Sequence, residues 1–418
     1  MRAKNAKTIF LLGAGASKDS NIPLSSEMGR EMVNFESSED LLDAYQDRQR
    51  RALRFIAGGL AFKAGMENYD PFYGVDVEAL FNAADHLARR TSLEVSPFIS
   101  AWHPAIKELE CPADYQAGEK IRQLARHIFE PESVGYSKDF SNLLLGLPVD
   151  AGEFSGGSIP GFHSSFYTAF ASAVKTITGQ TSSVLFEELK FTMIGLLQEI
   201  VWIDPRASDS FSRVDYIKPL ISFCKNNEAS IATLNYDNTL ELASEALSIE
   251  IDSGIKEWSK NGELSYSESS INLFKLHGSV DWRLVEETPT AKNPIPFQRI
   301  KIGNPSNDEN SLPAVIFGQA NKLTTEGPFL SILIKFKEAL HAAEELVVVG
   351  YSFRDKHINQ ILSEWLNGNE NRLMRIVNGK WHLYNLPFYT SEYGHLLRSR
   401  IKIEKLQANE FYAQLENR

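Results

Sequence analysis

The sequence predicts an α/β fold around an open, mostly parallel sheet, and three observations support this prediction. Short apolar runs recur along the chain, and a glycine-rich or polar cluster follows each run. Amphipathic helical patterns separate the runs, as in β–α–β units. The run Leu346–Val349 is almost continuously apolar and β-branched, which is typical of a parallel strand buried on both faces.

The first predicted strand is Thr8–Leu12, and the loop Gly13-Ala14-Gly15-Ala16-Ser17 follows it, with a helix opening behind. Glycines at 13 and 15 permit a tight turn and close approach of the backbone to a pyrophosphate, which a helix N-terminus would stabilise. The full dinucleotide fingerprint requires a third glycine at position 18, where Lys18 stands. A tight β–α turn without a ligand is therefore an open alternative.

Helical patterns dominate residues 25–225. Asp76 is a candidate N-cap for a helix with an apolar stripe from Val77 to Leu87, and a second stripe runs from Phe186 to Val201. Proline and glycine between residues 148 and 161 predict a loop. We predict a mainly helical inserted module over residues 25–225, with residues 1–24 and 226–418 forming a Rossmann-like domain.

Strand patterns return after residue 226. Four strands are predicted, at Ser230–Leu234, Ile271–Leu276, Leu346–Val349 and Trp381–Leu386. Pro328 begins one predicted helix, and Asp355 caps another. Prolines, asparagine and charges between Glu286 and Leu312 predict a long surface loop, a candidate lid.

Polar side chains follow these strands and, in a parallel sheet, would meet at one crevice. Asn235 and Asp237 follow the second strand, where an amide can hold a water or a carboxamide and a carboxylate can accept hydrogen bonds. The alternative is an Asx turn that closes the strand. His277 precedes a glycine at a strand end, a position that suits a general base, although a structural histidine is the alternative. Ser352 could bind a phosphate or ribose, or could simply belong to a turn.

Composition excludes several classes of protein. The 418 residues are 43% hydrophobic and carry a formal net charge of −11, which argues against direct nucleic-acid binding. The two cysteines, Cys111 and Cys224, rule out a disulfide framework and a four-cysteine zinc site. Because no apolar run reaches about 18 residues and no signal-peptide core is visible, we expect a soluble, cytoplasmic protein that binds no membrane.

Taken in order, the motifs resemble those of the sirtuin superfamily. They are Gly13–Ser17 with Ile22-Pro23, Thr233–Asp237, Leu276-His277-Gly278 and Gly350-Tyr351-Ser352. Within this superfamily, the chain more closely resembles SIR2-like domains of bacterial antiphage defence systems, in particular the SIR2 partner of a HerA-type ATPase. This closer resemblance rests on the segment from Gly350 to Asn359, the helix Val77–Phe81 and the helical insertion.

This resemblance implies a sirtuin-type NAD-binding fold with NAD⁺ as substrate. Gly13, Ala14, Gly15, Ala16 and Ser17 match the loop that wraps the pyrophosphate and ribose. Asn235 and His277 match the catalytic asparagine and histidine, and Asp237 matches an acid near the nicotinamide. Gly350 and Ser352 belong to the motif near the adenosine half, and Asn385 matches an asparagine that follows the late strand.

Two departures bear on the activity that the resemblance implies. Deacylating sirtuins carry a four-cysteine zinc module after the histidine, whereas no cysteine lies between His277 and Gly350 here, so no zinc is expected. Leu24-Ser25-Ser26 also stands where those enzymes have Asp-Phe-Arg. Both departures favour transfer of the ribose to water, which is an NAD⁺ glycohydrolase activity.

The resemblance further implies an effector of abortive infection that forms a homo-oligomer and assembles with a HerA-type ATPase. Three alternatives stay open from the sequence: an ADP-ribosyltransferase or cyclase, a non-catalytic sensor of NAD⁺ or ADP-ribose, and a nucleic-acid-binding subunit. The sequence also leaves the choice between NAD⁺ and NADP⁺ open.

Overall fold

The computed structural model describes residues 7–34, 44–67, 75–90, 182–289, 294–295, 297–303, 313–316, 327–379 and 382–416. The chain divides into two compact units, which we call the sheet unit (residues 1–32, 68–82 and 193–418) and the helical unit (residues 33–67 and 83–192). Segments 25–32, 75–82 and 193–225, which the sequence analysis assigns to the inserted module, belong to the sheet unit.

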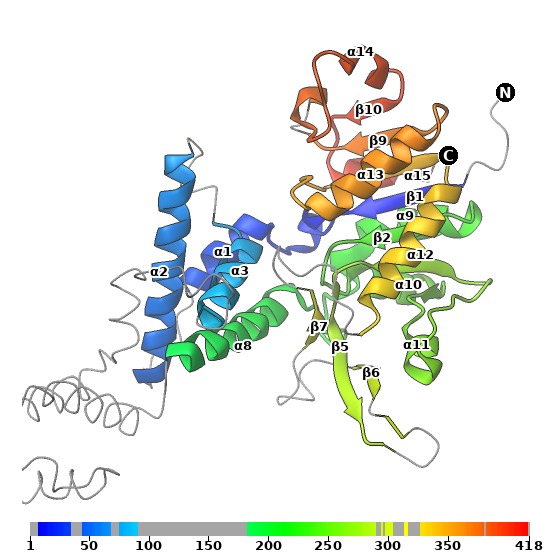
Figure 1. Ribbon diagram of the computed structural model, residues 1–418. Helices are drawn as coiled ribbons and strands as arrows, with labels where there is room; N and C mark the ends of the chain where they lie inside the picture. Colours follow the sequence, from blue (N-terminus) through cyan, green and yellow to red (C-terminus); the bar gives the residue numbers. More distant parts are fainter. Residues whose placement is uncertain are drawn as a thin grey trace, which may run out of the picture. The chain divides into compact units, whose positions relative to one another are not determined.

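The sheet unit is built on a seven-stranded sheet with the order β10-β9-β8-β1-β2-β4-β3 (Figure 1). Its strands are β1 (Thr8–Leu12), β2 (Ser230–Thr233), β3 (Ile251–Asp252), β4 (Ile271–Lys275), β8 (Glu345–Val349), β9 (Leu373–Val377) and β10 (Ile401–Glu404). Every pairing is parallel; Leu11 of β1, for example, lies between Ala232 of β2 and Val348 of β8. The predicted α/β fold with a mostly parallel sheet is confirmed.

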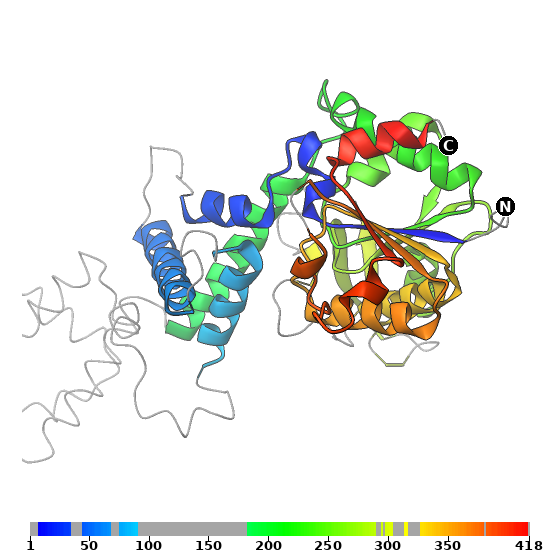
Figure 2. The ribbon, with the colours of Figure 1, turned by 90° about the horizontal axis from the view of Figure 1, so that it is seen from above.

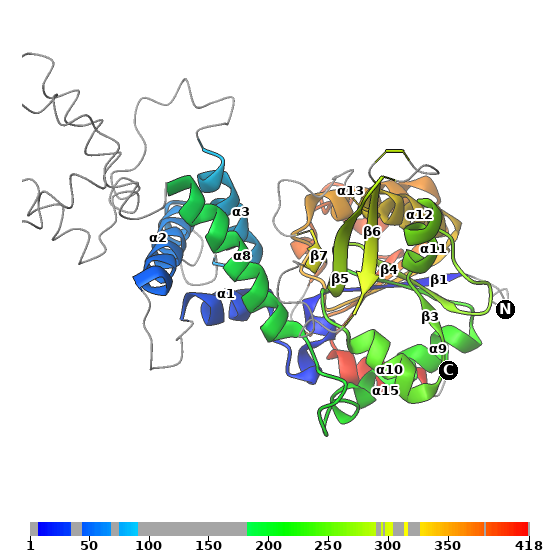
Figure 3. The same ribbon diagram turned by 90° about the horizontal axis from the view of Figure 1, so that it is seen from below.

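Helices cover both faces of this sheet. Those that pack on it are α9 (Lys218–Asn226), α10 (Thr239–Leu247), α12 (Phe329–Ala342), α13 (Lys356–Gly368) and α15 (Ala408–Leu415). Figures 2 and 3 show α9, α10 and α15 on one face and α12 and α13 on the other. Since α9 and α10 flank β2 in the chain while α12 and α13 flank β8, the helices change face around β1.

A second, antiparallel sheet replaces part of the predicted surface loop. Strand β5 (Gly278–Glu287) pairs with β6 (Phe297–Ile302) and β7 (Pro313–Val315), while α11 (Ile255–Asn261) packs beside β6. The loop prediction for Glu286–Leu312 was therefore wrong over residues 297–302. Among the β6 side chains that the structure describes, only Ile300 is buried, so the strand lacks the apolar run by which the others were identified.

The last predicted strand was also misplaced. Residues Leu373–Val377 form β9, whereas Leu383–Asn385, inside the predicted strand Trp381–Leu386, form a 3₁₀ turn. Strand β9 escaped prediction because Arg375 interrupts its apolar run. In the structure this arginine forms ion pairs with Glu345 of β8 and Glu404 of β10, each at 3.1 Å, which allows a charge inside the sheet.

The remaining elements are mainly helical. They are α1 (Ser25–Val33), α2 (Ala44–Met66), α3 (Val77–Ala88), α8 (Ser182–Val201), α14 (Gly394–Leu397) and the 3₁₀ segments η1 (Ala14–Ala16), η2 (Lys18–Ser20), η5 (Ser212–Ile217) and η7 (Leu383–Asn385). Within the helical unit, Lys190 of α8 forms an ion pair with Asp85 of α3 at 2.8 Å. None of the helices in the described ranges is long and apolar enough to cross a membrane. The predicted loop at 148–161 and Cys111 lie outside the described residues.

Candidate functional site

Four neighbouring strands carry the predicted polar clusters at their carboxyl ends. The strands are β8, β1, β2 and β4, which are consecutive in the sheet. Helices change face at this same point, and open α/β sheets bind ligands at such switch points. The structure thus brings segments near residues 13, 235, 277 and 350 to one edge of the sheet.

The side chain of Asn235 is fixed against the loop after β1. Its amide Nδ2 donates to the carbonyl of Gly13 at 3.0 Å and to Oγ of Ser17 at 2.9 Å. Its backbone N–H donates to Oγ1 of Thr233, which tightens the turn. Asn235 therefore joins the β1 and β2 segments of the site through hydrogen bonds that the sequence analysis did not predict.

The glycines after β1 serve the packing of two loops. The N–H groups of Gly13 and Gly15 donate to the carbonyls of Val349 and Gly350, and a Cβ on Gly13 would lie 2.6 Å from the Cα of Tyr351. Gly350 has φ +65°, and a Cβ there would lie 2.3 Å from the nitrogen of Ala16. Only glycine permits this approach at position 350.

The predicted helix directly behind this loop was wrong. The chain continues as the 3₁₀ turns η1 and η2, and the first α-helix begins at Ser25. Tyr216 supports the turns by donating to the carbonyl of Ala16 at 2.8 Å, and Arg213 donates to the carbonyl of Ser20. Burial raises the pKa of Tyr216, so its hydroxyl keeps the proton that it donates.

His277 forms a buried pair with Asp355. Its Nε2 lies 3.0 Å from Oδ2 of Asp355, and each side chain is 5% exposed. The other carboxylate oxygen of Asp355 caps α13 by accepting from the N–H groups of His357 and Ile358. A carboxylate only accepts hydrogen bonds, so Nε2 donates to it, and in the neutral imidazole Nδ1 is then the nitrogen with a lone pair. That Nδ1 atom is buried and has no hydrogen-bond partner within the described residues.

Residues near the start of α3 join this site, although the sequence analysis did not place them there. The phenol of Tyr236 donates to the carbonyl of Ile316 at 3.1 Å, and the carboxylate of Glu78 lies near it. The ring centre of Tyr236 lies 6.1 Å from that of His277. Burial, together with the nearby carboxylates of Glu78 and Asp355, raises the pKa of Tyr236 well above its ordinary value. Asp76 caps α3, as predicted, and pairs with Arg354 at 2.8 Å.

Three predicted residues occupy other settings. Oδ1 of Asp237 accepts from the N–H and hydroxyl of Thr239, which is the Asx-turn alternative. Ser352 is exposed on the turn before α13. Asn385 is exposed in η7, where its Oδ1 accepts from the N–H of His382, so the predicted strand end is not its setting.

Asn378 is the residue that directly follows β9, at the same edge of the sheet as the site. The sequence analysis passed over it because it placed the strand several residues later. The available signal was the run Leu373–Val377 followed by Asn-Gly, which is a common turn pair after a strand.

Comparison with known proteins connects this edge of the sheet with one family. Residues 229–384 match the family model of the SIR2-like domain, a segment that contains Asn235, His277 and Asp355. No curated protein matches the chain.

Solved sirtuin structures resemble the chain distantly. A Sir2 homolog–NAD complex is 12% identical over 56% of this chain and 73% of its own, with a TM-score of 0.33. A mutant Sir2 homologue in complex with ADP ribose is 13% identical over 56% and 76%, also with a TM-score of 0.33. A structure that addresses the mechanism and regulation of Sir2 enzymes is 10% identical over 99% of this chain and 92% of its own, with a TM-score of 0.35. The segment that matches the SIR2-like domain, residues 229–384, includes β2, β4 and β8 of the candidate site.

Proposed function

We propose that this protein hydrolyses NAD⁺ to nicotinamide and ADP-ribose. The observation that carries the proposal is the buried His277–Asp355 pair, which leaves Nδ1 of His277 as an unpartnered base at the same sheet edge as Asn235 and the glycine loop. The match of this segment to the SIR2-like domain supports NAD⁺ as the substrate.

In the proposed reaction, the bond between C1′ of the ribose and the nicotinamide nitrogen breaks, and its electron pair neutralises the cationic ring. Because the leaving group departs neutral, it needs no general acid. A water oxygen forms the new bond to C1′ and loses a proton to Nδ1 of His277. The carboxylate of Asp355 stabilises the resulting imidazolium, and the proton then passes to solvent.

The other residues of the site bind and orient the substrate in this proposal. Asn235 positions the attacking water or the carboxamide, and Asp237 acts as a positioning residue through the turn that follows β2. The loop of Gly13, Ala14, Gly15, Ala16 and Ser17 packs along the pyrophosphate and ribose. Gly350, Ser352 and Asn385 remain assigned to the adenosine half.

Chromatography of NAD⁺ incubated with the purified protein tests the proposal. Wild type should yield nicotinamide and ADP-ribose, whereas Asn235→Ala and His277→Ala proteins with native circular dichroism should lose at least about 100-fold in rate. Full turnover by folded His277→Ala would overturn the assignment. Binding of NAD⁺ without turnover would favour a sensor, and a cyclic or acceptor-linked product would favour a cyclase or transferase.

We further propose that the hydrolase acts in the cytoplasm as an effector of antiphage defence, in a homo-oligomer assembled with a HerA-type ATPase. Uncontrolled loss of NAD⁺ would kill the host cell, so restraint by a partner is expected. Co-expression with such an ATPase should give a joint peak in size-exclusion chromatography, and NAD⁺ should fall only in infected cells. A monomer without an ATPase partner would contradict this assembly.

A further inference from the structure

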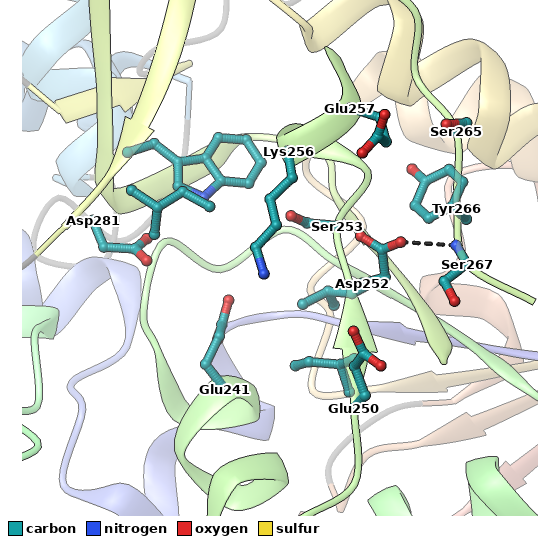
Figure 4. A pocket seen from close by; sticks show the side chains of 14 residues that line it. Glu241, Glu250, Asp252, Ser253, Lys256, Glu257, Ser265, Tyr266, Ser267 and Asp281 are labelled. Carbon is teal, nitrogen blue, oxygen red and sulfur yellow. Dashed lines mark hydrogen bonds between the residues drawn. The ribbon is translucent and has the colours of Figure 1, made fainter. Parts of the chain in front are cut away.

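An acidic cavity of the sheet unit is lined by none of the candidate active-site residues. A cavity of about 390 Å³ opens between α10, β3, α11, β5 and β6, within the sheet unit (Figure 4). Five of its lining residues are acidic: Glu241, Glu250, Asp252, Glu257 and Asp281. We propose that this cavity binds a small organic cation that carries ammonium or guanidinium groups.

The first argument is an excess of buried negative charge. The ammonium of Lys275, which is 1% exposed, lies 2.7 Å from Oε1 of Glu241. It also donates to the carbonyl of Asp237 and to the hydroxyl of Ser279, so its three N–H groups are all used. Lys275 therefore neutralises Glu241 and leaves Asp281 as a second carboxylate without an ion pair among the described residues.

The second argument is a set of polar atoms that point at the cavity without partners. Asp281 is 8% exposed, and its Oδ1 has no hydrogen-bond partner in the described structure. Oε2 of Glu241 and the hydroxyl of Tyr266 are likewise buried and unsatisfied among the described residues. Figure 4 shows the carboxylates of Glu241 and Asp281 turned toward the space between them. Buried acceptors without donors are costly, and a cationic ligand would supply the donors.

The local electrostatics agree with a net negative cluster. Burial raises the pKa of Glu241, Lys275 opposes this rise, and the neighbouring carboxylate of Asp281 adds to it. Burial alone would lower the pKa of Lys275, but Glu241 and Asp281 outweigh that effect and raise it. Lys275 thus stays charged, and two carboxylates compete for one cation.

The lining favours an organic cation over a metal ion. The acidic side chains come from several elements, and no group of three or more His, Cys, Asp or Glu side chains within the described residues is placed to hold a metal. Asp252 already accepts from the N–H groups of Gly254 and Ser267. The aromatic rings of Tyr266 and Trp282 add surfaces that attract ammonium and guanidinium groups.

The ammonium of Lys256 would compete with a cationic ligand for the cavity. The Lys256 side chain extends toward the carboxylates in Figure 4, yet it has no ion pair within 4.0 Å among the described residues. An external cation would displace it from the cavity. Removing this ammonium should therefore preserve or increase ligand affinity, whereas removing the Asp281 charge should weaken binding.

Isothermal titration calorimetry of the full chain tests the proposal, with spermidine and agmatine as probes at constant ionic strength. Either amine should bind wild type, Asp281→Asn should weaken binding at least about 10-fold, and Lys256→Met should bind as tightly or more tightly. Glu263→Gln, an exposed carboxylate outside the cavity lining, is the matched control and should bind like wild type.

Failure of both amines to bind would overturn the proposal. So would equal binding of Mg²⁺, which would mark a diffuse counter-ion effect, or unchanged affinity in Asp281→Asn. That variant replaces an uncompensated buried charge by a neutral isostere, so it should remain folded, as circular dichroism can verify. Because the readout is amine binding, its result is independent of NAD⁺ turnover.

Discussion

The carboxylate of Asp355 both pairs with His277 and caps α13, and a single substitution can separate these two effects. Asparagine is also a good N-cap, so Asp355→Asn should keep the cap of α13 while removing the charge beside His277. An amide nitrogen facing Nε2 would also force the proton onto Nδ1, where the proposed base must be unprotonated. We expect turnover of NAD⁺ to fall about 10²- to 10⁴-fold with little change in KM, measured by steady-state kinetics.

Asp355→Ala provides the comparison for this variant. It removes both the charge and the cap, so it should lose activity and about 1 kcal/mol of stability as well. If Asp355→Asn retains wild-type kcat, the His277–Asp355 pair is structural, and the general-base assignment is lost.

Gly350 offers a second test at the scale of one residue. Gly350→Ala combines a positive φ with a clash against Ala16, whereas Gly262→Ala has a similar φ, +78°, and open space around the new Cβ. We expect Gly262→Ala to cost about 1 kcal/mol and Gly350→Ala to cost clearly more, together with loss of nucleotide affinity. Thermal unfolding and ADP-ribose titration measure both effects; equal costs would show that the two loops can move apart.

For single residues, the sequence predicts which side chains lie at the end of each strand, but it says less about what those side chains contact. Asn235 and His277 lie at the predicted edge because a strand end fixes their place. The Asp355 partner of His277 is 78 residues away in the chain and was visible only as a helix cap. Glu78 was missed because a carboxylate on a predicted helix gives no sign that the start of this helix meets Tyr236.

Among the elements, strands with uninterrupted apolar runs were predictable and those that carry charges were not. Strand β8 presents four consecutive buried apolar residues, Leu346–Val349. Strand β9 places Arg375 between two glutamates of neighbouring strands, so its stability depends on pairings that the local sequence does not reveal. Strand β6 carries Arg299 and Lys301 and, among its described side chains, buries only Ile300, so it too lacks an apolar run.

Lys275 at the end of β4 illustrates how a buried charge supports an element. Lys275→Met should destabilise the sheet unit by about 3–5 kcal/mol, because Glu241 and Asp281 would then face each other without a cation. Urea unfolding measures the loss. Adding Glu241→Gln to this variant should recover part of it, and a double variant as unstable as the single one would contradict the charge argument.

The raised pKa of Lys275 implies that the unfolding free energy depends on pH. The pKa of Lys275 in the folded state lies above the ordinary 10.5, because the nearby Glu241 and Asp281 carboxylates outweigh burial; Asp237 adds to their effect. The resulting stabilisation should be fully present below pH 10.5 and should be lost as the pH rises through the folded-state pKa. The difference in unfolding free energy between wild type and Lys275→Met should therefore shrink above pH 10.5. A difference that stays constant with pH would refute the assigned role of the Lys275 charge.

For the molecule as a whole, the sequence predicts the fold class well because the chemistry repeats at each strand end. One apolar run with a glycine loop predicts little, but four runs that meet in β8-β1-β2-β4 require one parallel sheet and one ligand edge. The sequence does not reveal that residues 75–82, within the predicted insertion, belong to the sheet unit. That association depends on long-range contacts such as the pair Asp76–Arg354.

Hydrogen exchange can test this division across the whole chain. Bound ADP-ribose should slow exchange in the loop 13–17, the turn 350–355 and the start of α3 at 76–79, because these segments belong to the sheet unit and its ligand edge. The slowing should approach about 100-fold at a ligand concentration 100 times Kd. Helix α2, which belongs to the helical unit, should exchange as in the free protein.

The Gly350→Ala protein, with its loop packing broken, should show no protection at the same ligand concentration. Protection of α2 in wild type would mean that the ligand reaches, or rigidifies, the helical unit, and the assignment of the nucleotide site to the sheet unit alone would then be wrong.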